Sequence, residues 1–518
     1  MKKIAILSNI NIDPLKNHIE KDGGYNVYLG AYDQWLFELL NNSSGLYNFN
    51  PDFIFIYLNA EELKADISDL FRAIDFYSQT NSASHFIISN FSYPPYSVST
   101  YLNSDKIKTS DFNTKLENYA ASKNNISIFD FNRIITYHGY KALFDEKYWY
   151  LGRIKFSNQG FSELRKELNN LLNCIQGKTK KVLVLDLDNT LWGGIAGEDG
   201  WENLQISEEG IGKIYSDFQK NIKLLAQQGV VLATCSKNNE SDIQEVFEKN
   251  RSMYLNWEDF VIHKINWEAK DKNILEISQT LNLGLDSMVF IDDNPVEREL
   301  VLKNLPEVTV PDFPKDISTL NSWFVNQVIY PHFAKRNITK EDLDKSNQYK
   351  RNAARNHSER QLNYDDFIRE LNIKLTIEKV SDDHFQRVAQ LTQKTNQFNA
   401  TVKRYTDSEI RSLAQKGYEI YTCEYEDKFG REGIIGCAII NLDKNKMIID
   451  SFLLSCRALG RKVEFSFLDN IIKQTKHSSI NKIEIFYTES PRNLMVKKFL
   501  IDFGFTSDDA GLFTKTIN

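Results

Sequence analysis

The stretch that most constrains the fold of this chain is Lys181–Gly194, whose sequence is KVLVLDLDNTLWGG. Its apolar residues Val182 to Leu185 run without a break into a polar segment that contains Asp186 and Asp188. A short apolar run that ends abruptly in polar residues is typical of a strand buried on both faces of a parallel sheet. In such sheets, ligands bind just beyond the carboxyl ends of the strands. The motif therefore predicts an α/β domain with carboxylates at its reactive edge.

Three later segments place further polar groups after apolar runs. These groups are Ser236 after residues 230–234, Lys270 after residues 261–265, and Asp292 with Asp293 after residues 288–291. Because parallel strands bring their carboxyl ends to one edge, we expect all these groups to meet the carboxylates of the first motif. The pattern predicts one shared site.

The residue types at this edge fit the transfer of a phosphoryl group. Such a reaction needs a nucleophile, a proton donor, groups that hold the phosphate oxygens, and a cation. Asp186 can attack the phosphorus, and Asp188 can protonate the leaving oxygen. Ser236 and Lys270 can hold phosphate oxygens. Asp292, together with Asp186, can bind magnesium, a hard ion that prefers oxygen ligands.

These residues resemble the four motifs of the haloacid dehalogenase (HAD) superfamily of phosphatases, over residues 181–310. A narrower similarity covers nearly the whole chain: VLDLDNTLWGG, CSKNN, INWEAKDKNI, FIDDNPVERE, LTQKTNQFNAT and SCRALGRKVE are similar to segments of the FkbH-like proteins. Those enzymes take a glyceryl unit from 1,3-bisphosphoglycerate, remove phosphate, and load the unit onto an acyl carrier protein. The resemblance implies a Mg²⁺-dependent phosphatase and acyltransferase. Its partners would be a phosphorylated three-carbon acyl donor and a carrier with a phosphopantetheine arm.

The resemblance also implies roles for individual residues. The expected catalytic residues are Asp186, Asp188, Cys235 and Lys270. The expected substrate-binding residues are Thr190, Ser236, Asn238, Arg457 and Gly460, and the expected metal ligands are Asp186, Asp188, Asp292 and Asp293. FkbH-like proteins are thought to pass through a cysteine-bound glyceryl group, and Cys235 stands directly beside Ser236. The alternative for Cys235 is an inert packing residue at the end of a buried strand.

The spacing between the motifs leaves no room for an inserted cap domain. From Thr190 to Thr234 only one helix and a short loop fit, and from Lys270 to Asp292 only one helix fits. Both gaps are much shorter than an ordinary domain. The central domain, expected at residues 176–315, is therefore predicted to be a HAD-like parallel-sheet domain without a cap. An open site favours a large partner such as a carrier protein.

Residues 1–175 alternate apolar runs with helical stretches. The expected strands are residues 4–7, 52–57, 85–89 and 126–131, and helices such as residues 61–77 lie between them. This order predicts a doubly wound, flavodoxin-like α/β domain whose layout resembles the SGNH hydrolases. Ser8 follows the first strand, but Tyr148-Trp149 and Lys155-Phe156-Ser157 stand where that family has its late Asp-x-x-His. Without a placed histidine, we expect a non-catalytic binding or docking domain.

Residues 316–372 predict a helical connector to a third domain, residues 373–518. The expected order of elements there resembles the acetyltransferase-like (GNAT) α+β fold. Arg457 to Lys462 correspond in part to the pyrophosphate loop of that family, where backbone amides at a helix start hold phosphate. Binding of CoA or phosphopantetheine at Arg457 and Gly460 is one interpretation. An ordinary basic surface is the other, because Lys462 replaces the last small residue of the loop.

Composition limits the classes of function. The formal net charge of −7 argues against broad nucleic-acid binding, which needs a clustered basic face. The five cysteines lie far apart, as in reduced cytosolic proteins, and no apolar stretch approaches a membrane span. We expect a cytoplasmic α/β enzyme of three domains without nucleic-acid or membrane partners. Two alternatives stay open: a plain HAD phosphatase on a phosphomonoester in polysaccharide or secondary-metabolite assembly, and a binding scaffold with a vestigial site.

Overall fold

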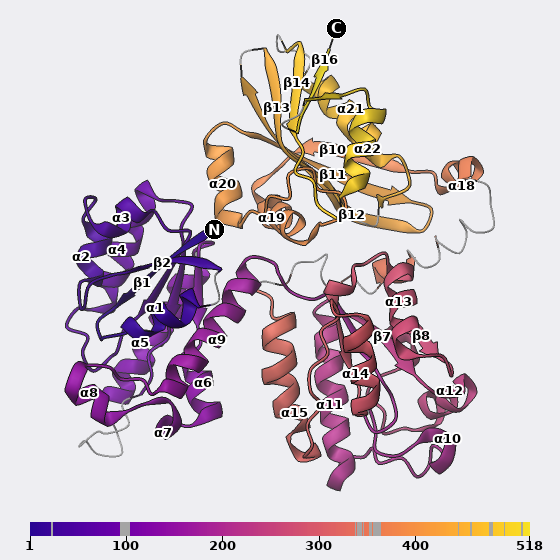
Figure 1. Cartoon of the computed structure of the whole chain (residues 1–518), viewed down its shortest axis with the longest axis horizontal. Helices are drawn as coiled ribbons and strands as arrows, with labels where there is room; N and C mark the ends of the chain where they lie inside the picture. Colours follow the sequence, from indigo (N-terminus) through magenta and orange to yellow (C-terminus); the bar gives the residue numbers. More distant parts are fainter. Residues whose placement is uncertain are drawn as a thin grey trace. The chain divides into compact units, whose positions relative to one another are not determined.

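The computed structural model of the chain is shown in Figure 1. It describes residues 1–21, 24–93, 104–336, 338, 344, 347–351, 355, 364–443, 445–455, 458–475, 480–491, 493–508 and 511–517. The chain forms two compact units: Met1–Leu172 with Tyr405–Gly417, and Asn173–Arg404 with Tyr418–Asn518. No helix among the described residues is long and apolar enough to cross a membrane.

The first unit is built on a parallel sheet in the order β2-β1-β3-β4-β5. Its strands are β1 (Lys2–Ser8), β2 (Tyr25–Leu29), β3 (Phe53–Tyr57), β4 (His85–Ser89) and β5 (Ile126–Phe129). Its helices are α1 (Asp13–Glu20), α2 (Trp35–Leu40), α3 (Gly45–Phe49), α4 (Ile67–Thr80), α5 (Ser104–Ala121), α6 (Phe131–His138), α7 (Tyr140–Leu143), α8 (Glu146–Gly152) and α9 (Asn158–Ile175). The predicted parallel α/β class is confirmed, while the SGNH resemblance stays a prediction. The sequence pattern missed β2, an edge strand that buries only Val27.

Helix α20 (Asp407–Gln415) also belongs to this first unit, although its residues lie within the third domain expected from the sequence. Thr406 and Glu409 form a capping box at its start. The Lys2 Nζ atom lies 3.0 Å from Glu409 Oε1, so an ion pair joins α20 to the first strand of the unit.

The second unit begins with the central domain, a parallel sheet in the order β8-β7-β6-β9. Its strands are β6 (Val182–Leu185), β7 (Val231–Ser236), β8 (Phe260–Ile265) and β9 (Met288–Ile291). Its other elements are α10 (Ala196–Asp199), α11 (Gly210–Gln227), α12 (Glu240–Lys249), η1 (Trp257–Asp259), α13 (Lys270–Leu281), η2 (Leu285–Ser287) and α14 (Pro295–Asn304). Only these short helices separate the strands, so residues 182–304 contain no inserted cap domain. The elements agree with the expected absence of a cap, and the open site stays a prediction.

The core of the central domain continues beyond residue 315, where the sequence placed its end. After η3 (Ile317–Thr319), helix α15 (Leu320–Trp323) runs into the π-helix η4 (Phe324–Phe333). Leu320, Phe324, Val328 and Phe333 are buried in the same apolar cluster as Leu183 and Leu185 of β6. Phe324 meets Phe218 of α11 with 4.9 Å between ring centres, and α11 and α15 lie side by side in Figure 1.

The rest of the second unit is built on a mixed sheet in the order β10-β11-β12-β13-β14-β16-β15. Its strands are β10 (Lys374–Lys379), β11 (Glu419–Asp427), β12 (Gly430–Asp443), β13 (Lys446–Leu454), β14 (Lys482–Phe486), β15 (Thr506–Ser507) and β16 (Leu512–Thr516). Its helices are α18 (Tyr364–Leu371), η5 (Asp382–His384), α19 (Phe385–Lys394), α21 (Val463–Thr475) and α22 (Leu494–Asp502). Neighbouring strands are antiparallel except for β13 and β14, which pair in parallel. The predicted α+β character of this domain is confirmed.

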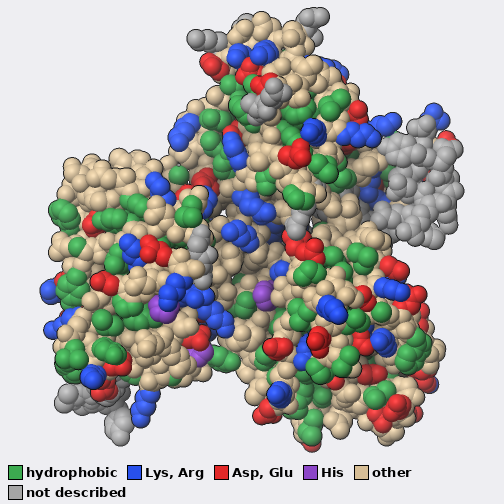
Figure 2. Space-filling model, viewed as in Figure 1, with side chains coloured by type: hydrophobic (Ala, Val, Ile, Leu, Met, Phe, Trp, Pro, Cys, Tyr) green, Lys and Arg blue, Asp and Glu red, His purple; other side chains and the backbone are tan. Residues whose placement is uncertain are grey.

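The surface of the molecule carries charges of both signs. Figure 2 shows acidic, basic and apolar side chains interspersed on the face in view, including the part at the lower right that holds the central domain.

Candidate active site

The central domain brings together the charged residues that follow its strands. Asp186 follows β6, Asp292 follows β9, and Lys270 begins α13 just after β8. The Lys270 Nζ atom lies 2.8 Å from Asp186 Oδ1 and 2.5 Å from Asp292 Oδ2, and all three side chains are buried. Burial alone would lower the pKa of Lys270, but the two carboxylates outweigh burial and raise that pKa above its ordinary value.

Three carboxylates in this cluster are arranged to hold a metal ion. One oxygen atom from each of Asp186, Asp292 and Asp293 lies within 4.8 Å of the others. Burial, followed by the negative charge of Asp186, raises the pKa of Asp292 to about 6, against the opposing effect of Lys270. Burial and Asp186 likewise raise the pKa of Asp293. Crowded, buried carboxylates with only oxygen donors fit a hard divalent cation.

Hydrogen bonds fix the position of the acidic loop, the segment after β9 that carries Asp292 and Asp293. The Asp293 backbone N–H donates to Thr190 Oγ1 at 3.2 Å, so the two motifs are joined directly. Arg298 donates to the carbonyl oxygens of Asp292 and Asp293 at 2.8 and 2.7 Å. Asn294 caps α14, and Pro295 occupies its first turn, which ends the acidic segment in a helix. Thr190 therefore lies at the predicted site, where it holds the acidic loop.

The carboxylate of Asp188 is not among the three that lie together in this group, and its expected role as a metal ligand stays a prediction. Its Oδ1 atom accepts hydrogen bonds from Trp192 Nε1 and the backbone N–H of Ala196, both at 3.0 Å. Its Oδ2 atom accepts from Asn238 Nδ2 at 2.9 Å. These three N–H donors fix the position of the Asp188 carboxylate.

Asn238, which the sequence indicated as a substrate contact, lies between two other predicted site residues. Its amide donates both to Asp188 and, at 3.0 Å, to Ser236 Oγ, so it connects two predicted catalytic groups. Sequence reasoning missed Trp192, a fully buried indole four residues after Asp188. The indole N–H of a buried tryptophan needs a hydrogen-bond acceptor. A tryptophan so close to Asp188 in the sequence was the signal that could have indicated this contact.

Cys235 is enclosed in the core. Its side chain has no exposed surface and belongs to an apolar cluster with Val184, Ala233 and Phe290. Its Sγ atom donates a weak hydrogen bond to the carbonyl oxygen of Lys270 at 3.7 Å. Burial raises the pKa of the thiol well above its usual range, which disfavours the reactive thiolate. The structure gives no support to a nucleophilic role and describes a packing residue.

The remaining predicted residues lie in the C-terminal domain. Arg457 lies outside the described residues. Gly460 is described, with a φ of +77°, in a turn before α21. The backbone N–H of Leu454, at the end of β13, donates to the carbonyl oxygen of Phe398. The backbone N–H of Ala400 donates to the carbonyl oxygen of Phe452 in the same strand. The carbonyl oxygen of Ala400 accepts from the backbone N–H of Thr488. The segment 398–400 thus forms an isolated antiparallel bridge with β13 beyond the point where β13 and β14 stop pairing.

In the N-terminal unit, Ser8 has no histidine beside it among the described residues. Its Oγ atom accepts from the Ile10 backbone at 3.2 Å. His85 lies at the start of β4, the opposite edge of the sheet, and faces Ser127 at 2.9 Å. His18 stacks on Phe161, and His138 lies 3.4 Å from Glu163.

Comparisons with known proteins yield matches among solved structures. No family model matches the chain, and no curated protein matches it. The N-terminal part of the protein BF1531 from Bacteroides fragilis, crystallised in complex with magnesium, contains a phosphatase domain; it has 30% sequence identity and a TM-score of 0.60. The match covers 64% of this chain and 94% of that chain.

Two further solved structures match a smaller part of the chain. Ard1 from Thermoplasma volcanium has 13% identity and a TM-score of 0.22, covering 28% of this chain and 98% of that one. A GNAT-family acetyltransferase from Staphylococcus aureus Mu50 has 12% identity and a TM-score of 0.23, covering 28% of this chain and 100% of that one.

The uncapped parallel sheet and its Asp186, Lys270 and Asp292 cluster define a phosphatase domain of the HAD type. The chain belongs to the same family of phosphatase-domain proteins as BF1531.

Proposed function

We propose that the chain is a Mg²⁺-dependent phosphatase and acyltransferase of the FkbH-like kind. It takes a glyceryl-type unit from 1,3-bisphosphoglycerate, removes phosphate, and loads the unit onto an acyl carrier protein. The observation that carries the phosphatase part is the buried cluster of Asp186, Lys270, Asp292 and Asp293 at an uncapped sheet edge. The magnesium bound by BF1531 supports the choice of ion. The sequence resemblance supports the choice of donor and carrier.

The described side chains supply each part of the phosphatase step. A carboxylate oxygen of Asp186 attacks the phosphorus, a new P–O bond forms, and the bond from phosphorus to the leaving oxygen breaks. Asp188 gives that oxygen its proton. Water then attacks the aspartyl phosphate, Asp188 takes a proton from the water, and phosphate leaves. Lys270 and Ser236 hold the phosphate oxygens. Asp186, Asp292 and Asp293 would hold a magnesium ion, which would supply positive charge for the phosphoryl group.

Acyl transfer need not use a protein thiol. The acyl phosphate of the donor is already activated, so the pantetheine sulfur of the carrier can attack its carbonyl carbon. A C–S bond forms, the C–O bond to phosphate breaks, and the thiol proton passes to the departing phosphate. This direct route agrees with the burial of Cys235.

Exposed apolar side chains at the catalytic edge suit a large acceptor. Trp267 follows β8 and is 70% exposed, and Val296 follows the acidic loop and is also 70% exposed. Ile195, in the loop after β6, is 37% exposed. Large apolar side chains exposed near a reactive site are typical of a contact surface. We infer that the carrier docks over this open edge.

Intact-mass spectrometry of a pantetheinylated carrier tests the proposal. With enzyme, magnesium and 1,3-bisphosphoglycerate, the carrier should gain a glyceryl group. With Asp186→Asn it should gain the same group with one phosphate retained, because transfer would proceed and dephosphorylation would stop. An unmodified carrier, combined with release of phosphate from small esters, would favour the plain phosphatase. An unmodified carrier without any phosphate release would favour the scaffold.

A further inference from the structure

An ion pair between Lys237 and Glu297 joins the segments that flank β6 at the catalytic edge. Lys237 directly follows β7, and Glu297 lies in the first turn of α14, after β9. Because β7 and β9 are the two neighbours of β6 in the sheet, the pair links both sides of the strand that Asp186 follows. The Lys237 Nζ atom lies 2.5 Å from Glu297 Oε1. The Glu297 side chain is mostly buried, at 12% exposed, whereas that of Lys237 is 36% exposed.

Glu297 occupies a position where a glutamate ordinarily caps its own helix. It is the third residue of α14, after the N-cap residue Asn294, and in a capping box such a side chain accepts from the N-cap backbone N–H. Here the Asn294 backbone N–H donates to Asp292 Oδ1 at 2.9 Å instead. The Glu297 carboxylate is therefore not used in capping, and its Oε1 atom accepts from Lys237. Its Oε2 atom is buried and accepts no hydrogen bond from the described residues.

Glu297 also lies within the electrostatic reach of the catalytic cluster. Burial has the largest effect on the pKa of the Cys235 thiol, which it raises, and Lys270 opposes that effect. The negative charges of Asp186, Asp292 and Glu297 raise the same pKa further. These carboxylates therefore lie near one point of the structure. A buried acceptor without a donor is unfavourable, so a bound molecule that donates to Glu297 beside this cluster would be stabilised.

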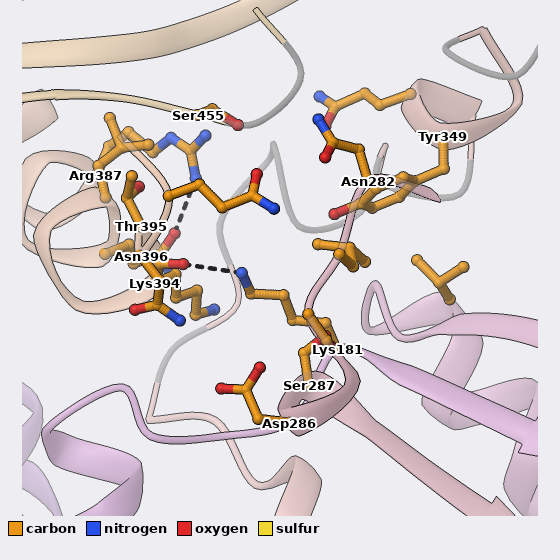
Figure 3. Close-up of a pocket in the computed structure, with 17 residues that line it drawn as sticks. Lys181, Asn282, Asp286, Ser287, Tyr349, Arg387, Lys394, Thr395, Asn396 and Ser455 are labelled. Carbon is orange, nitrogen blue, oxygen red and sulfur yellow. Dashed lines mark hydrogen bonds between the residues drawn. The ribbon is translucent and has the colours of Figure 1, made fainter. Parts of the chain in front are cut away.

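The cavity drawn in Figure 3 provides a contrast at the other end of the central strands. Its lining includes Lys181, which precedes β6, and residues of α19. Lys181 Nζ donates to the main-chain oxygen of Lys394 at 2.8 Å, and Arg387 donates to that of Ile434 at 3.0 Å. The chain itself thus engages these two cations, whereas it provides no described donor for Glu297 Oε2.

A 2-hydroxyacyl group fits both members of the pair. Glu297 Oε2 needs an O–H or N–H donor, and Lys237 has three N–H groups, of which the pair uses one. A hydroxyl beside a carbonyl or carboxyl group presents a donor and an acceptor on adjacent carbons. We propose that Lys237 and Glu297 are specificity-determining residues that recognise such a group while its phosphate lies at Asp186. This inference rests on the proposed phosphatase function and assigns it a substrate class, the phosphate esters of 2-hydroxy acids.

Relative rates on three phosphate esters test the pair in the full chain with magnesium. The esters are 3-phosphoglycerate, 3-phosphonooxypropanoate, which lacks the hydroxyl, and glycerol 3-phosphate, which lacks the carboxyl. The wild-type enzyme should favour 3-phosphoglycerate over each of the others by at least about tenfold in kcat/KM. Glu297→Leu should abolish the preference for the hydroxyl, and Lys237→Met should abolish the preference for the carboxyl. Glu297→Gln keeps an oxygen acceptor, so its preference for the hydroxyl should lie between those of the wild type and Glu297→Leu.

Lys264→Met and Glu276→Leu are the matched controls, because this ion pair also joins a strand to a helix, β8 to α13, in the same domain. Neither should change the two preferences. Equal losses on all three esters in Glu297→Leu and Lys237→Met would overturn the proposal and leave the pair a structural link. Equal kcat/KM for the three esters in the wild-type enzyme would overturn it as well, while the phosphatase function would stand. A wild-type enzyme that hydrolyses none of them would overturn both.

Discussion

The N-terminal and central domains both place polar residues after the strands of a parallel sheet. The two domains differ in the hydrogen-bond and charge partners that these residues have. In the N-terminal domain they bind one another. Asn9 Nδ2 donates to the carbonyl oxygen of Asn59 at 3.0 Å, and Asn9 Oδ1 accepts from the Asn59 backbone at 2.7 Å. Asn90 donates to Asp130 at 2.8 Å, and Asp130 caps α6. Each of these polar side chains therefore has a partner within the chain.

In the central domain the charges at the equivalent edge do not balance. Asp186, Asp292 and Asp293 lie together, and the lysine that pairs with two of them is Lys270. A surplus of buried negative charge is unfavourable without a cation. The comparison teaches that position beyond a parallel strand does not identify an active site by itself. A cluster of buried charges that the neighbouring side chains do not balance is the feature that identifies an active site here.

Substitution of Asp186 should have the largest effect. Asp186→Asn should reduce phosphate release by a factor on the order of 10³ or more, because the amide is a poor nucleophile and a weak magnesium ligand. A malachite-green assay of free phosphate measures this. Asp217→Asn, at an exposed position on α11, is the matched control and should keep full activity. Phosphate release that survives both Asp186→Asn and EDTA would contradict the assignment.

Substitution of the donors to Asp188 should have an intermediate effect. Trp192→Phe and Asn238→Ala each remove one N–H donor to this carboxylate. We expect kcat for an alkyl phosphate to fall about ten- to a hundredfold, since proton donation contributes on the order of 10²–10⁴ to such reactions. The KM should change little.

Rates for two substrates with different leaving groups show whether Trp192 and Asn238 act by positioning Asp188. Hydrolysis of p-nitrophenyl phosphate, whose leaving group needs no proton, should fall much less than hydrolysis of glycerol 3-phosphate. Trp257→Phe, which alters an indole stacked on His263 away from Asp188, is the control. Equal losses for both substrates would show that Trp192 and Asn238 only maintain the fold.

The sequence predicted the central site well because its signals are local. Asp186 and Asp292 directly follow buried strands, Ser236 ends β7, and Lys270 begins the helix after β8. Parallel pairing brings such positions together. The absence of a cap was predicted from the lengths of the segments between the motifs alone.

The features that the sequence did not predict depend on distant contacts. The pairing of Asn238 with Asp188 requires the turn after β7 to approach the turn after β6. The burial of Cys235 depends on Phe290 and Val184 from neighbouring strands. The inclusion of α20 in the first unit depends on Lys2, about four hundred positions away in the sequence, and no local pattern reveals such a contact.

Substitution of Asn9 should affect stability and leave chemistry intact. Asn9→Ala removes both bonds to Asn59 and leaves a buried N–H without a partner, which costs about 1–3 kcal/mol. Hydrogen exchange measured by mass spectrometry should show faster exchange in β1 and β3. Asn11→Ala removes only one exposed hydrogen bond and should change protection little. A loss of phosphate release in Asn9→Ala that exceeds its loss of stability would give this edge a chemical role.

Substitution of Cys235 should have the smallest effect on activity, and it tests whether the thiol takes part in transfer. Cys235→Ala leaves the cluster around Asp186 and Lys270 in place and creates a small cavity, which costs about 1 kcal/mol of stability. We expect phosphate release and carrier loading to stay near the wild-type rates. Iodoacetamide should alkylate Cys235 slowly in the folded protein and quickly in urea, because the thiol is buried and its pKa is raised.

A role for Cys235 in acyl transfer predicts a different and equally specific result. If Cys235 carries the acyl group, wild-type enzyme given an acyl phosphate without a carrier should gain a hydroxylamine-labile adduct on the peptide from Val230 to Lys237. Cys235→Ala should then lose both adduct and carrier loading while it still hydrolyses simple phosphate esters. Because the thiol has no exposed surface, that outcome would require β7 and α13 to separate during turnover. Faster hydrogen exchange at these two elements in the presence of donor would reveal the opening. Without such exchange, direct transfer to the carrier thiol is the mechanism that the buried position of Cys235 allows.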